Sequence, residues 1–102
     1  MNTLDIICSS ITKRHKLSVR GKDDLDWRTI EPHIVYEAAN GNILVDFYQT
    51  DGYSSSGRLP AWKRLLLDDI LQINKIEQRF NARNAEGYNP TSDRYVKVIC
   101  KV

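Results

Sequence analysis

The chain has 102 residues, of which 41% are hydrophobic and 27% charged. That is enough for one globular domain and too little for two. Its net charge of +2 lacks the large basic excess typical of bulk nucleic-acid binding. No apolar run approaches the about 18 residues that cross a bilayer, and no basic residue precedes the apolar positions of residues 1–10. We therefore expect no membrane span and no secretory signal, and predict a cytoplasmic protein.

Residues 4–14 are predicted to form a helix. Asn2 or Thr3 can cap its start, because their side-chain oxygens accept from free backbone N–H groups. The basic run at 13–16 falls at its end, where cations complement the helix dipole. The apolar face has helical spacing and consists of Leu4, Ile7, Cys8 and Ile11.

Beyond residue 16 the apolar period changes to two, which predicts strands. The first holds Leu17 and Val19 and precedes a turn at 21–24. Strands at 27–31 and 33–38 follow, separated by Pro32, which suits an edge or a bend. Asn40-Gly41 predicts a hairpin, because both residues tolerate positive φ. The returning strand should place Ile43, Val45 and Phe47 on one side and Leu44, Asp46 and Tyr48 on the other.

The second half of the chain is predicted to contain a long loop at 50–60 and a strand at 62–67 that ends at Asp68-Asp69. Leu71 and Ile73 are out of phase with Ile76 and Phe80, which predicts a bulge near Asn74. Residues 81–93 are polar and end in a turn. The last strand, at 95–102, should present one apolar face formed by Val96, Val98, Cys100 and Val102.

These elements predict one mainly β domain over residues 1–102, with a helix at 4–14 and strands from about 17 to 102. A small SH3-like or Sm-like barrel fits best, because closure removes exposed strand edges. Cys8 and Cys100 lie at opposite ends of the sequence. Without an export signal, we expect them to be buried apolar residues rather than a disulfide.

Four short segments carry a resemblance to a known family. They are the helix that runs into a strand (11–19), Arg28-Thr29-Ile30-Glu31-Pro32-His33, the strand Trp62 to Ile70, and Phe80 with Gly87-Tyr88-Asn89-Pro90. In this order they resemble the WYL domain, an SH3-like or Sm-like barrel found mostly in bacterial regulators. The resemblance runs over about residues 5–90 and is to short stand-alone members without the helix-turn-helix part.

The resemblance implies transcription regulation through a basic groove that senses a negatively charged ligand, often a nucleotide or nucleic acid. The chain departs from the family pattern at two places. Gly41-Asn42-Ile43-Leu44 stands where the Trp-Tyr-Leu trio falls, so only Leu44 remains. The later strand keeps a cation at Lys63, but the second family arginine falls on Asp69, which reverses the charge.

The residues themselves indicate a site for an anion with a planar group. Arginine binds phosphate through two parallel N–H groups, lysine acts as a point charge, and aromatic faces stack on bases. We predict a non-enzymatic ligand-binding site for a nucleotide or single-stranded nucleic acid. The alternative interpretation is that the aromatic residues only pack and the cations only cover a strand. The candidate ligand-binding residues are Arg28, His33, Tyr36, Tyr48, Arg58, Trp62, Lys63 and Arg64.

Two other classes stay open. The only histidines, His15 and His33, have no nameable nucleophile or carboxylate partner, so we predict no catalytic residue, no metal and no cofactor. A magnesium nuclease would need Glu31, Asp46, Asp68 and Asp69 together, with Lys63 as partner, although Asp68-Asp69 is more typical of a turn. A protein-interaction module or homodimer could use aromatic grooves or an open strand edge near Pro32.

Overall fold

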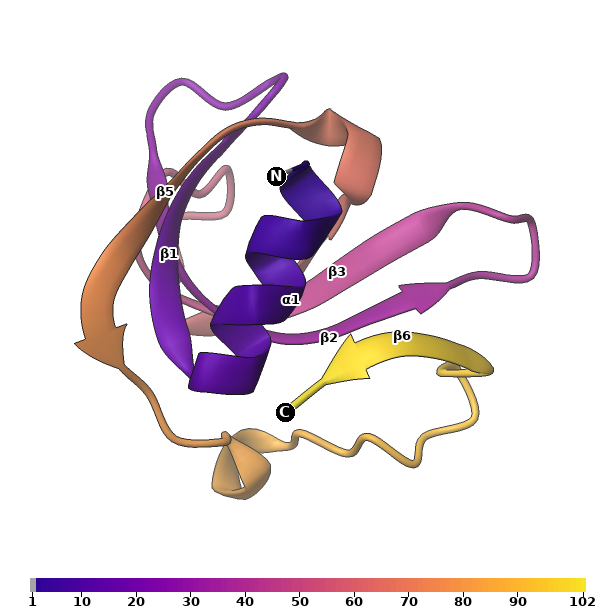
Figure 1. Ribbon diagram of the computed structural model, residues 1–102. Helices are drawn as coiled ribbons and strands as arrows, with labels where there is room; N and C mark the ends of the chain where they lie inside the picture. The colour runs from indigo at the N-terminus through magenta and orange to yellow at the C-terminus, as the bar shows by residue number, and fades with distance from the viewer. Residues whose placement is uncertain (1) are drawn as a thin grey trace.

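The computed structural model describes residues 2–102 and contains one α-helix, six strands and two short 3-10 helices (Figure 1). The elements in chain order are α1 (Thr3–Lys13), β1 (His15–Gly21), β2 (Arg28–Glu37), β3 (Ile43–Gly52), β4 (Ala61–Leu66), η1 (Leu67–Asp69), β5 (Ile70–Arg79), η2 (Asn84–Glu86) and β6 (Lys97–Lys101). In residues 2–102, no helix is long and apolar enough to span a bilayer.

The N-terminal helix confirms the expected cap and apolar face. The Asn2 side chain accepts a 2.8 Å hydrogen bond from the backbone N–H of Asp5. Ile7 and Ile11 are buried against the sheet. The helix ends at Arg14, whose φ of 57° is left-handed and turns the chain directly into β1.

The six strands form one antiparallel sheet, which confirms the mainly β class. The strand order is β4-β3-β2-β1-β5, and β6 pairs with the second half of β2, beyond the start of β1. Figure 1 shows the sheet strongly curled around α1. Over the described residues, however, β4 and β5 do not pair, so hydrogen bonds do not close the sheet into the expected barrel.

Strand β2 corrects the prediction of two segments separated at Pro32. It runs unbroken from Arg28 to Glu37, and Pro32 lies inside the sheet opposite Phe47. The register shifts between Pro32 and Ile34, so the expected bend is present as a bulge. Within residues 2–102, β2 has no open edge around Pro32, because β3 lies on one side and the Val102 N–H donates to the His33 carbonyl on the other.

The two faces of the sheet carry different side chains. The helix face packs against α1 and holds the larger apolar core. The loop face is covered by residues 80–96, which run along the bottom of Figure 1, below β6 and β2. The expected alternation in β3 is confirmed: Val45 and Phe47 lie in the apolar core, whereas Asp46 and Tyr48 face the loop side.

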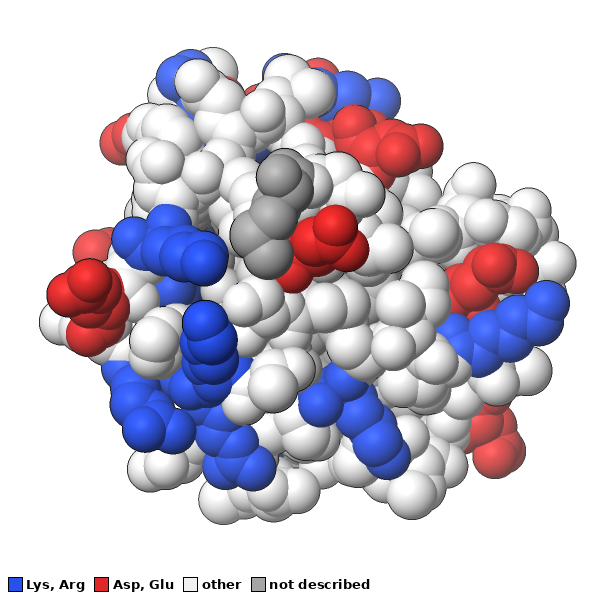
Figure 2. Space-filling view, viewed as in Figure 1, with Lys and Arg blue, Asp and Glu red and all other residues white. Residues whose placement is uncertain are grey.

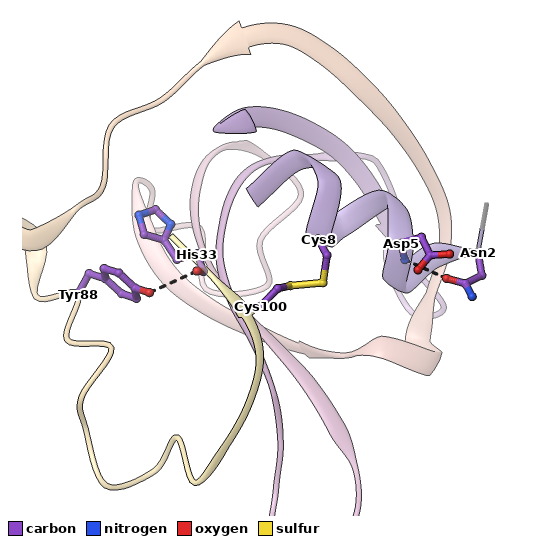
Figure 3. The surroundings of a disulfide bond; sticks show 6 residues. All are labelled: Asn2, Asp5, Cys8, His33, Tyr88 and Cys100. Carbon is purple, nitrogen blue, oxygen red and sulfur yellow. Dashed lines mark hydrogen bonds between the residues drawn. A yellow bond between two sulfur atoms is a disulfide. The ribbon is translucent and has the colours of Figure 1, made fainter. Parts of the chain in front are cut away.

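A disulfide joins Cys8 of α1 to Cys100 of β6, and the expectation of free cysteines is wrong (Figure 3). The curled sheet brings the last strand beside the helix, so the two Cα atoms lie 5.8 Å apart across a separation of 92 positions. Local sequence patterns do not report such proximity. The bond fastens the two ends of the chain to each other.

The last two strands depart from simple alternation. In β5 the register shifts lie between Ile70 and Gln72 and between Lys75 and Arg79. The second shift begins next to Asn74, where the phase of the apolar residues predicts a bulge. Because of the first shift, Leu71 is 65% exposed while Ile70 is buried. The apolar face expected for the last strand is confirmed only in part: Cys100 and Val102 pack against the core, whereas Val96 and Val98 are 79% and 40% exposed. The strand β6 begins at Lys97 rather than Tyr95.

Gly52 ends β3 where two strands approach closely. Its φ is +95°, and an added Cβ would contact the Trp27 carbonyl and lie 2.8 Å from the Arg28 Cα. We expect Gly52→Ala to lower the free energy of unfolding by about 2 kcal/mol or more, from left-handed strain and a backbone clash. Urea unfolding measures this loss.

Gly41→Ala is the matched control for this prediction. Gly41 has a similar φ of +86°, but nothing lies within 4 Å of its Cβ position. Gly41→Ala should lower the free energy of unfolding only by the backbone strain of the left-handed conformation, about 1 kcal/mol. Equal losses in the two variants would contradict the clash at Gly52.

Candidate functional site on the loop face

Asp46 of β3 binds side chains from several elements on the loop face. Its buried carboxylate accepts hydrogen bonds from Arg64 Nε at 2.8 Å, Tyr95 Oη at 2.8 Å and Tyr36 Oη at 3.1 Å. Arg94 adds a cation 3.9 Å away. One carboxylate on β3 therefore holds both β4 and the segment that precedes β6.

The pKa shifts of the groups around Asp46 favour these hydrogen bonds at neutral pH. Burial, followed by the nearby Asp46 charge, raises the pKa of Tyr36 to about 12. Burial and then the hydrogen bond to Asp46 raise the pKa of Tyr95 as well. The hydrogen bond to Asp46 is the main cause that raises the pKa of Arg64. Near neutral pH both tyrosines are thus donors and Arg64 is a cation.

A second buried carboxylate, Glu31, anchors the other end of the loop face. Arg83 reaches it with two nitrogens, Nε at 2.7 Å and Nη2 at 3.0 Å. Lys16 lies 3.5 Å from the same group. Glu31 is fully buried, whereas the Arg83 side chain is 33% exposed. Hydrogen bonds to the Glu31 and Glu86 carboxylates raise the pKa of Arg83, so its positive charge is secure.

His33 lies at the centre of an aromatic cluster on this face. Its ring centroid is 4.8 to 5.1 Å from those of Trp62, Phe80 and Tyr88. The Arg83 backbone N–H donates to Nε2, so Nδ1 carries the proton that the Glu31 carbonyl accepts. Burial lowers the pKa of His33 and keeps it neutral. Both ring nitrogens are occupied, and the side chain supports the site without being accessible to a ligand.

Tyr88 fastens residues 80–96 to the sheet. Its hydroxyl lies 3.3 Å from the carbonyl oxygens of His33 and Val102, and Figure 3 shows it directed at His33 from the covering segment. Burial, followed by the charge of Asp46, raises the pKa of Tyr88 to about 12. The contact holds the cover against β2 and the C-terminus.

A cleft of about 400 Å³ opens between β4 and the covering segment. Its size lies within the range of small-ligand sites. Trp62 forms one wall, with Nε1 donating to the Glu86 carbonyl at 2.7 Å. We call it the Trp62 cleft. Its lining residues are Asp46, Trp62, Lys63, Arg64, Gly87, Asn89, Ser92, Arg94 and Tyr95.

Two cations of the Trp62 cleft are available to a ligand. Lys63 Nζ donates only to the Ser56 hydroxyl, at 3.0 Å, and forms no ion pair within the described chain. Arg94 is 57% exposed and only approaches Asp46 at 3.9 Å. Arg64, in contrast, is held at 2.8 Å by Asp46. The cleft therefore combines two cations that have no close carboxylate partner with the rings of Trp62 and Tyr95.

The structure brings together some of the residues predicted for the site. Trp62, Lys63 and Arg64 line the cleft. Tyr36 supports it through Asp46, and the Tyr48 ring packs against Trp62 at 5.3 Å. These five come from β2, β3 and β4, as the sequence predicted.

Arg28, His33 and Arg58 do not line the cleft. Arg28 makes two 2.7 Å hydrogen bonds to Asp24 and a third, at 3.2 Å, to Gln49. Burial raises the pKa of Asp24, but hydrogen bonds from Arg28 and Gly21 outweigh it and the pKa lies below its usual value. Arg28 thus holds the 21–24 turn. Arg58 lies exposed in the loop before β4.

The acidic residues considered for a magnesium site do not gather. Glu31 pairs with Arg83, Asp46 with Arg64, and Asp69 with Lys22. Within residues 2–102, no group of three His, Cys, Asp or Glu side chains could hold a metal ion. The geometry gives no support to the nuclease alternative.

Sequence reasoning missed Arg83, Arg94 and Tyr95, because it predicts only a polar connection at 81–93 and places Tyr95 at the start of the last strand. One signal was present: the aromatic residue Tyr88 interrupts that polar stretch, and Tyr95 follows it closely. Large aromatic rings in an otherwise polar loop tend to pack against the rest of the protein, because burying their large apolar surface is favourable.

Comparison with models of known families, with curated proteins and with solved structures finds no match for this chain.

Proposed function

We propose that the protein is a non-enzymatic, regulatory domain that binds a negatively charged ligand with a planar group, a nucleotide or single-stranded nucleic acid, in the Trp62 cleft. The observation that carries the proposal is the pairing of Lys63 and Arg94 with the rings of Trp62 and Tyr95 around one cleft. Cations beside aromatic faces suit a phosphate next to a base. The four short motifs make a divergent, SH3-like WYL domain our proposal for the family.

The cleft predicts how binding responds to charge removal. In Lys63→Gln/Arg94→Gln we expect the affinity for adenosine triphosphate at low salt to fall at least tenfold, because each charge-assisted hydrogen bond contributes about 1.5 kcal/mol or more. The fold should survive, since neither cation is tightly paired. Trp62 fluorescence in a Trp27→Phe background reports the binding directly.

Lys22→Gln/Lys97→Gln is the charge-matched control. Both lysines are exposed and lie outside the cleft, so this variant should bind nearly as the parent does. Unchanged affinity in Lys63→Gln/Arg94→Gln, with the fold intact by near-ultraviolet circular dichroism, would contradict the cleft as the binding site.

A protein-interaction module is the second candidate, and β6 supports it. Val96, Val98 and Ile99 are 79%, 40% and 42% exposed on or beside a strand that pairs only with β2 in the described sheet. Exposed apolar side chains beside an unpaired strand edge suit strand addition by a protein partner or a second copy. Such binding should be less sensitive to salt than that of a phosphate.

The disulfide bears on the compartment. Cytosolic thiols are kept reduced, whereas disulfides persist in oxidising compartments. The Cys8–Cys100 bond therefore supports an oxidising location rather than the cytoplasm that the sequence predicted. Counting the alkylated cysteines of protein taken directly from its source cells distinguishes the two.

A further inference from the structure

A second group of cations lies at the end of α1, outside the Trp62 cleft. Figure 2 shows Lys and Arg side chains gathered at the lower left, over the end of α1 and the neighbouring end of β5. The sheet places them together: His15 pairs with Arg79, and the Phe80 N–H donates to the Arg14 carbonyl at 2.9 Å. The end of α1 and the start of β1 carry Lys13, Arg14 and Lys16, β5 ends at Arg79, and Arg83 shares Glu31 with Lys16. We call these five residues the α1-end cluster.

Three members of the cluster have no carboxylate partner. Lys13, Arg14 and Arg79 are exposed and form no ion pair with any described residue. Lys16 and Arg83 share the buried Glu31. An excess of uncompensated cations on one patch creates a local positive potential that the net charge of +2 does not reveal.

The cluster and the cleft are joined by one continuous strip of side chains. The guanidinium of Arg83 lies over the Tyr48 ring, 4.8 Å from its centroid. The Tyr48 ring in turn packs against Trp62 at 5.3 Å, and Trp62 is a wall of the cleft. Arg83, Tyr48 and Trp62 therefore form one row of contacts that runs from the α1-end cluster to the Trp62 cleft.

From this strip we infer that the α1-end cluster binds phosphate groups of a single nucleic-acid strand whose base or terminal nucleotide lies in the Trp62 cleft. The inference rests on the proposed function and narrows it to an oligonucleotide. Proteins that hold single strands without reading their sequence combine cations for the phosphates with aromatic rings on which the bases stack. A mononucleotide would occupy the cleft alone and leave the cluster unused.

Length dependence tests the inference. Labelled oligothymidylates of three and twelve nucleotides, with adenosine triphosphate as competitor, are titrated by fluorescence anisotropy at two salt concentrations. We expect the twelve-mer to bind at least tenfold more tightly than the three-mer. In Lys13→Gln/Arg14→Asn/Arg79→Gln that advantage should vanish, and the slope of log affinity against log salt should fall by about 2. Asn is chosen at position 14 because it tolerates the left-handed backbone there.

The controls separate this inference from the proposed function. Lys22→Gln/Lys97→Gln/Lys101→Gln removes the same charge elsewhere, and an equal loss in it would overturn the cluster as a specific surface. A twelve-mer no tighter than the three-mer overturns the inference and leaves the cleft standing. A twelve-mer indifferent to Lys63→Gln/Arg94→Gln overturns both. Binding to phosphatidylserine vesicles but not to oligonucleotides overturns the choice of nucleic acid.

Discussion

Replacing both cysteines by alanine (Cys8→Ala/Cys100→Ala) is expected to lower the free energy of unfolding by about 4 to 5 kcal/mol. The disulfide closes a loop of 92 positions, almost the whole chain, so in the unfolded state it removes much of the chain's freedom. Small domains are stable by only about 5–15 kcal/mol in total. The variant should therefore lie close to its unfolding transition at room temperature, as urea titration followed by circular dichroism would show.

Reduction of the parent protein is the matched control. With a thiol reductant present, the parent should unfold at nearly the same urea concentration as the variant, and reductant should leave the variant unchanged. Complete reduction, verified by alkylation, with no loss of stability would show that the packing of α1 against β6 suffices without the bond.

The second large effect is expected from Arg83→Met, which should lower the free energy of unfolding by about 4 kcal/mol. Glu31 is fully buried and would lose both hydrogen bonds from Arg83. Only Lys16 would remain near it, at 3.5 Å. Removing one partner of a buried ion pair costs about 3–5 kcal/mol, because the other charge stays in a low-dielectric environment. Chemical unfolding of the variant measures the loss.

Arg94→Met and the double variant Glu31→Leu/Arg83→Met make this prediction specific. Arg94 is 57% exposed and lies 3.9 Å from the Asp46 carboxylate. Its replacement should therefore lower the free energy of unfolding by less than about 1 kcal/mol. The double variant removes both charges and should recover much of the stability. If the double variant is no more stable than Arg83→Met, the stranded charge is not the cause of the loss.

Part of the candidate site followed from strand periodicity. Alternation placed Asp46 and Tyr48 on the face opposite Phe47, and the same face receives Trp62 and Arg64 from the neighbouring strand. Neighbouring strand residues point to opposite faces. Periodicity could not show that Arg28 is held by Asp24, because both lie near a turn whose geometry depends on the folded sheet.

The local elements followed from the residue pattern alone: the capped helix, the hairpin at Asn40-Gly41 and the two-faced strand β3. Each depends on residues a few positions apart, whose steric and hydrogen-bonding preferences are fixed by the chain itself. Three features arose only in the folded chain: the open sheet, the disulfide across 92 positions, and the contact between His33 and Arg83, 50 positions apart. Such contacts form because the curled sheet brings segments that are distant in the sequence close together in space. The spacing of nearby residues carries no information about these contacts.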